Sequence, residues 1–182
     1  MRTINASGKE YTLYSVTGKV AASNKNMETR VSGGGGGGYH GSGYTSPVTI
    51  TSTTTVHDQI FLIDESGKEH SFQLQNFDLA CREGNELSVI WAIKKGKKTG
   101  EHIVVHNHST EKTFFDTGAI RRMFRPPWFI PIILTVIFLF MSSGTGIMLA
   151  IITWAVYIGY TINRANNFKV NFSPIQAGLA IF

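Results

Sequence analysis

The fold of this chain is decided by PWFIPIILTVIFLFM (residues 127–141) and IMLAIITWAVYIGYTI (residues 147–162), two apolar stretches without an ionisable residue. The small residues SSGTG at 142–146 separate them. A single helix through both stretches would be about 54 Å long at a rise of ~1.5 Å per residue, whereas the hydrocarbon core of a bilayer is ~30 Å thick. We therefore expect a two-helix transmembrane hairpin over residues 127–163 with its turn at 142–146. The short arms leave open a re-entrant hairpin that enters the bilayer and returns without crossing it.

Basic residues flank both ends of the predicted hairpin and indicate its orientation. Because short basic flanks stay on the cytoplasmic side, we expect both chain ends in the cytoplasm and an integral protein of the bacterial inner membrane. Residues 121–126 would form a basic juxtamembrane linker, and residues 164–182 a cytoplasmic tail. An aromatic residue at the start of the first arm suits the membrane interface. The predicted membrane-flanking residues are Arg121, Arg122, Arg125, Trp128, Arg164 and Lys169.

The net charge of +5 comes entirely from these flanks. Residues 121–182 contain five basic and no acidic residues, so residues 1–120 carry no net charge. The basic composition therefore does not indicate a nucleic-acid partner, for which basic residues would cluster on the folded domain. The single cysteine, Cys81, excludes an intrachain disulfide and is compatible with a reducing compartment. The polar residues 1–10 predict no cleavable signal peptide.

Residues 1–120 show a hydrophobic period of two and predict a cytoplasmic β domain. About seven short strands favour a small antiparallel barrel or sandwich, because an open sheet of this size would leave its edges unprotected. In the most regular strand, the face that carries Trp91 is expected to point into the core, and the face with Ser88 and Ile90 away from it. The expected strands cover residues 11–20, 48–56, 60–63, 70–74, 87–93, 101–108 and 113–115.

A glycine-rich stretch at residues 32–46 interrupts the β domain. Six consecutive glycines at 33–38 cannot offset the backbone entropy of a regular element, so we expect a mobile loop. No Gly-Lys-Ser/Thr sequence or helix pattern follows, as a phosphate-binding Walker loop would require. The loop could instead close over a protein partner through Tyr39 and Tyr44.

Three histidines in the strand at 101–108 are the candidate metal ligands. His102, His106 and His108 have equal parity, so a regular strand places them on one face, opposite the core-directed Ile103 and Val105. This spacing could hold a zinc ion with a further ligand from a neighbouring strand. The alternative is a solvent-facing row of histidines without metal, because no cysteine or carboxylate lies beside them at ligand spacing.

The turn before this strand is rich in lysine, with Lys94, Lys95, Lys97 and Lys98 around Gly96. A lysine-rich hairpin tip is typically a solvated turn that keeps a domain soluble. Beside an anionic leaflet the same tip could contact lipid headgroups, each lysine contributing on the order of 1 kcal/mol. No interleaved aromatic residues indicate binding to nucleic acid.

Three functions follow from these features. The first is a non-enzymatic membrane accessory or scaffold protein, whose β domain is presented to a protein partner, which could be a second copy of the chain. The second is a subunit of an oligomeric channel or transport system, although the arms contain few polar residues to mark an ion path. The third is a metal-dependent hydrolase built on the histidine row, for which no paired base or nucleophile is seen.

Overall fold

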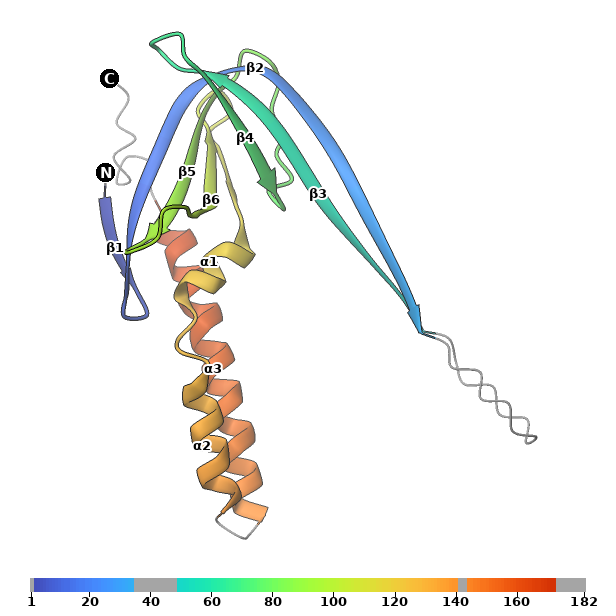
Figure 1. The fold of residues 1–182 in the computed structure, drawn as a ribbon, viewed down its shortest axis with the longest axis vertical. Helices are drawn as coiled ribbons and strands as arrows, with labels where there is room; N and C mark the ends of the chain where they lie inside the picture. The colour runs from blue at the N-terminus through green and yellow to red at the C-terminus, as the bar shows by residue number, and fades with distance from the viewer. Residues whose placement is uncertain (1, 35–48, 141–143, 173–182) are drawn as a thin grey trace, which may run out of the picture.

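The computed structural model describes residues 2–34, 49–140 and 144–172. In this part of the chain seven strands precede three helices, which confirms the predicted mainly β domain of about seven strands at the N-terminal side of the apolar helices (Figure 1). The strands are β1 (Arg2–Ala6), β2 (Lys9–Gly34), β3 (Thr49–Ile63), β4 (Glu69–Gln75), β5 (Glu86–Lys94), β6 (Glu101–Asn107) and β7 (Lys112–Phe115). The helices are α1 (Thr117–Phe124), α2 (Phe129–Leu139) and α3 (Gly144–Asn171).

The strands form one antiparallel sheet with the order β4-β3-β2-β5-β6-β7, and β1 pairs with β2 outside this path. β1 and β3 share one edge of β2, because β5 pairs along the other edge from Tyr11 to Lys19. Among the described residues no pairing joins β4 to β7, so this sheet does not close on itself. The structure thus confirms an antiparallel sheet but does not show the expected barrel or sandwich.

β2 is much longer than the predicted strand at residues 11–20. It has 26 residues, pairs with β5 in its first part and continues with β3 in its second. Gly18 lies where the two pairings meet, and a Cβ atom there would be 2.5 Å from the carbonyl oxygen of Ile63. A glycine is needed at this position because the backbones approach so closely.

The distal parts of β2 and β3, residues 27–34 and 49–56, form a two-stranded ribbon that we call the β2–β3 arm. It extends away from the helices and the other strands (Figure 1). Ser32, Gly33 and Gly34 belong to β2, so the predicted loop at 32–46 is wrong for its first residues. Its remaining residues lie outside the described part of the chain.

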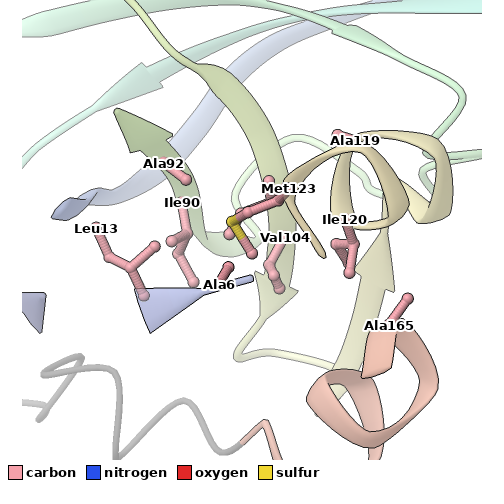
Figure 2. Close-up of a cluster of buried hydrophobic side chains, with 10 residues drawn as sticks. Ala6, Leu13, Ile90, Ala92, Val104, Ala119, Ile120, Met123 and Ala165 are labelled. Atoms are coloured by element: carbon pink, nitrogen blue, oxygen red, sulfur yellow. The ribbon is translucent and has the colours of Figure 1, made fainter. Parts of the chain in front are cut away.

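Both faces of β5 and β6 are buried. On one face Ile90, Ala92 and Val104 pack with α1 and with Ala165 of α3 (Figure 2). On the other face Leu87, Val89 and Val105 pack with side chains of β3, β4 and the segment after β4. The expectation that the face of Ser88 and Ile90 turns away from the core is therefore wrong. Helices and β1 cover it, a long-range arrangement that the alternation within one strand does not reveal.

The helical part departs from its predicted boundaries. α1 begins after Asp116, whose side chain accepts a hydrogen bond from the Ala119 backbone N–H, and ends before two prolines. The expected linker at 121–126 is therefore helical up to residue 124. α3 begins at Gly144, inside the expected turn at 142–146, and continues to Asn171. The first residues of the expected tail at 164–182 are thus part of α3.

The structure does not show the two-helix transmembrane hairpin that the sequence predicts, because the described residues contain one spanning helix. α3 has 28 residues and is the one described helix that is long and apolar enough to cross a membrane. α2 has 11 residues, about 16 Å in length, and is therefore too short to cross by itself. α1 and α2 taken together are long and apolar enough to cross, but the two helices are bent by 60° relative to each other. α2 runs away from the sheet and α3 runs back to it (Figure 1).

Candidate functional site

The junction between the sheet and the apolar helices is held by side-chain hydrogen bonds to the backbone that links α1 to α2. Ser7 in the β1–β2 turn donates to the carbonyl of Phe124. Lys9 Nζ donates to the carbonyl of Arg125 at 2.9 Å, and the Tyr157 hydroxyl of α3 donates to that of Pro126 at 2.9 Å. These bonds place the β1–β2 turn, the end of α1 and the middle of α3 at one level of the molecule.

Beyond this level the surface of α2 and α3 is apolar on all sides. In the most apolar window of α3 only 17% of the residues are buried, unlike a core helix of a soluble domain. The exposed apolar side chains of the two helices include Phe129, Ile133, Ile137, Leu139, Phe140, Ile147, Met148, Ile151, Val156 and Ile158.

Three threonines and one tryptophan of these helices find hydrogen-bond partners inside the protein. The hydroxyl groups of Thr135, Thr153 and Thr161 each donate to the carbonyl four residues earlier. The indole N–H of Trp154 donates to Thr135 Oγ1 at 3.1 Å and so connects α3 to α2. Such internal pairing is what a hydrocarbon environment demands of polar groups.

A groove of about 390 Å³ lies where α1, the α1–α2 link and α3 meet. We call it the arginine groove. Arg121 lines it from α1, and Arg125 and Trp128 line it from the link. The remaining lining residues come from α3: Trp154, Tyr157, Ile158, Thr161 and Ile162.

The arginines of this region differ in their ion pairing. Arg122 Nε lies 3.1 Å from Glu101 Oε1, and its guanidinium also lies near Asp116. Within the described residues the guanidinium groups of Arg121 and Arg125 have no ion pair and no hydrogen bond. The arginine groove is therefore positively charged without internal compensation.

The other two predicted flanking residues lie on the last part of α3. Arg164 Nε donates to the Tyr160 hydroxyl, and its guanidinium carbon lies 5.5 Å from the centre of the same ring. Lys169 lies in the last turn of α3. A second cavity of about 420 Å³, which shares Tyr157 with the arginine groove, is lined mainly by apolar side chains of α2 and α3.

The lysine turn lies at the same level as this junction. Lys95 forms an ion pair with Glu10 at 2.6 Å, and the side chains of all four lysines, Lys94, Lys95, Lys97 and Lys98, are exposed. Burial, and then the positive charges of Lys94 and Arg125, lower the pKa of Lys9. The tip of the β5–β6 hairpin therefore adds positive charge beside the arginines.

The structure does not bring the three predicted histidine ligands together. Ile90 pairs with Val104 and Trp91 with His102, so Ile103 is an extra residue in β6, a β-bulge. His102 then lies on the face of Trp91 and Phe72, with ring centres 6.3 and 5.7 Å away. The prediction that one face carries all three histidines is wrong because the bulge reverses the alternation.

His106 and His108 remain neighbours, with ring centres 4.6 Å apart. His106 Nδ1 lies 2.9 Å from Thr113 Oγ1, and His108 Nε2 lies 2.7 Å from Ser88 Oγ. Ser88 is fully buried, so this Ser–His hydrogen bond is not accessible to a substrate. Among the described residues no group of three or more His, Cys, Asp or Glu side chains could hold a metal ion. We therefore do not propose a zinc site or a metal-dependent hydrolase.

The β2–β3 arm is the second candidate surface, and the sequence analysis did not identify it. Its paired residues alternate between two faces, and one face carries Met27, Val31 and Ile50, which are 72%, 63% and 69% exposed. The opposite face is polar, and its Glu28 side chain lies 3.5 Å from that of His57, the residue that follows the arm. In the sequence, Met27, Thr29 and Val31 alternate with the charged Glu28 and Arg30, a pattern that could have predicted a strand with one apolar face. The predicted partner contacts Tyr39 and Tyr44 lie outside the described residues.

Comparisons of this chain with protein-family models, with curated proteins and with solved structures found no match.

Proposed function

We propose that this chain is a non-enzymatic integral membrane protein that presents its β domain to a protein partner. α2 and α3 anchor it in the bilayer, with the sheet and both chain ends on the cytoplasmic side of a bacterial inner membrane. The β2–β3 arm is the element that contacts the partner, which could be a second copy of the chain.

The observation that carries this proposal is the continuous exposed apolar surface of α2 and α3. In water such a surface would be far larger than the apolar patches that soluble monomers expose. It adjoins Trp128, Arg121 and Arg125, which line the arginine groove and suit the headgroup region of a membrane. Arg164 follows the apolar part of α3 on the returning helix.

The β2–β3 arm is the feature that favours a protein partner for the β domain. A two-stranded ribbon alone is at most marginally stable in water. No described strand pairs with the outer edges of the arm, and no described element covers its apolar face. A partner that adds a strand or covers this face would satisfy the edge hydrogen bonds and bury the apolar side chains.

The anchoring is tested by cysteine accessibility in intact and permeabilised cells. In a Cys81→Ser background, Gly144→Cys marks the start of α3, where an added Cβ meets no atom within 4 Å. Glu65→Cys, in the exposed β3–β4 turn, is the control.

We expect an impermeant maleimide to label the Gly144→Cys variant from the outside, and the Glu65→Cys variant only after permeabilisation. Labelling of the Glu65→Cys variant from outside, or release of the protein by alkaline carbonate, would contradict the proposal. If neither variant reacts from outside, the hairpin is re-entrant.

The arm is tested by photo-crosslinking in cells. A photoreactive amino acid at Met27 or Val31 lies on the apolar face, and the same amino acid at Arg30 or Thr53 lies on the polar face. We expect one defined cross-linked product from the apolar positions and little from the polar ones. Equal products from both faces would indicate nonspecific collision and contradict the assignment of the arm.

A further inference from the structure

The arginine groove combines two chemistries in one depression. At one end it presents the two arginines without internal partners, Arg121 and Arg125. The rest of its lining is aromatic and aliphatic, including Trp154 and Ile158 of α3. A ligand that fits both parts needs an anionic group joined directly to an apolar chain.

From this geometry we propose that the arginine groove binds one anionic phospholipid from the membrane. Its phosphate is held between Arg121 and Arg125, and its acyl chain follows α3 away from the sheet, past Ile158 and then Trp154. This inference rests on the proposed anchoring of α2 and α3 in the bilayer.

The charge of the site argues for an anionic headgroup. No acidic residue lines the groove, while Arg122, one residue away, is already paired with Glu101. Guanidinium groups bind phosphate through charge-assisted and often bidentate hydrogen bonds. The lowered pKa of Lys9, which reflects burial and the nearby charges of Lys94 and Arg125, is consistent with an uncompensated positive field at this level.

The position of the groove argues for a lipid rather than a soluble phosphate compound. Trp128, which is 68% exposed, lies at the end of the link before α2, where a membrane-interface aromatic belongs. Along α3, away from the sheet, the groove is lined by Ile158 and then Trp154, whose side chains are part of the exposed apolar surface. A soluble phosphate compound would leave this apolar part of the groove unoccupied.

The test uses fluorescence quenching in bilayers. The full-length protein carrying Trp91→Phe retains Trp128 and Trp154 as its only tryptophans, both in the groove. It is reconstituted in phosphatidylcholine vesicles with increasing fractions of either brominated phosphatidylglycerol or brominated phosphatidylcholine. The protein with Trp91 retained is measured in parallel, with Trp91 as a constant background, so the result does not depend on the substitution.

We expect quenching by brominated phosphatidylglycerol to saturate at a low lipid fraction, whereas brominated phosphatidylcholine quenches only in proportion to its amount. Arg121→Gln and Arg125→Gln should each weaken this preference about fivefold, and both together about twenty-five-fold, at ~1 kcal/mol per arginine near an anionic group. Arg122→Gln removes the same charge from the same helix outside the groove, and should leave the preference unchanged.

Several outcomes would overturn the assignment. Equal quenching by the two brominated lipids shows that no selective site exists, while the membrane anchoring still holds. An equal loss of preference in Arg122→Gln shows a general effect of surface charge. Displacement of the brominated lipid by millimolar inorganic phosphate shows a soluble-anion site. If neither brominated lipid quenches, Trp128 and Trp154 are outside the bilayer and the proposed anchoring itself fails.

Discussion

At the scale of single residues, Ile103 shows how one position can separate a predicted site. As the extra residue of a β-bulge in β6, it shifts His102 to the face opposite that of His106 and His108. His102 consequently packs among the rings of Trp91 and Phe72 instead of facing a metal ion or solvent.

This placement predicts a pH dependence of stability. Burial lowers the pKa of His102 below its usual value of 6.5. Between the two pKa values the unfolded chain binds more protons than the folded one, so the stability is complete above pH 6.5 and falls as the pH drops below it. We expect His102→Phe, which preserves a ring against Trp91 and Phe72, to show a smaller decrease in melting temperature between pH 7.5 and 5.5. An unchanged decrease would show that another group is responsible. Part of the decrease should remain, because burial and His108 also lower the pKa of His106.

Gly18 gives a second prediction at this scale. A Cβ atom there would lie 2.5 Å from the backbone oxygen of Ile63, which cannot move without shifting β3. We expect Gly18→Ala to reduce the free energy of unfolding by about 1–3 kcal/mol, as overpacking typically does. The control is Gly33→Ala in the arm, where the nearest atom, Ile50 Cγ1, is at 3.8 Å. Chemical denaturation of both variants checks this, and equal stability would contradict the close approach.

At the scale of elements, α3 has two environments along its length. Its first part exposes apolar side chains, whereas Ala165 is fully buried against the sheet and α1 (Figure 2). Phe168 and Phe172 pack against the same cluster. Residues 1–120 alone would lack Met123 and these α3 contacts, so we expect them to be less stable than the whole chain.

Two alanines of α3 test this division. Ala165→Leu inserts a larger side chain into the packed cluster, which should cost about 1–3 kcal/mol of unfolding free energy. Ala155→Leu makes the same change at an exposed position of the same helix and should be nearly neutral. Thermal unfolding in detergent measures both. A similar loss in the two variants would show that α3 does not pack on the sheet through Ala165.

At the scale of the whole molecule, the β2–β3 arm is a projection whose removal should spare the rest of the fold. Asn26 and His57 are paired across β2 and β3, so residues 27–56 can be replaced by an Asn-Gly turn. Neither hydrophobic cluster includes a residue of the arm. We expect the free energy of unfolding to change by less than about 1 kcal/mol, since exposed changes usually have small effects. Co-purification of the partner with the protein should be lost. Unfolding of the shortened protein would instead assign the arm a structural role.

Local patterns in the sequence by themselves determined the mainly β domain, the sequence positions of most strands, the apolar stretches and the basic flanks, because each depends on residues close together in the chain. Only the tertiary structure decided the boundaries of α3, the burial of both faces of β5 and β6, and the grouping of Arg121, Arg125 and Trp154 around one groove. These features depend on contacts between distant segments. The prediction that His102, His106 and His108 share one face was wrong for a related reason. Strict alternation holds only in a strand without a bulge, and the pairing of β6 with β5 introduces a bulge at Ile103.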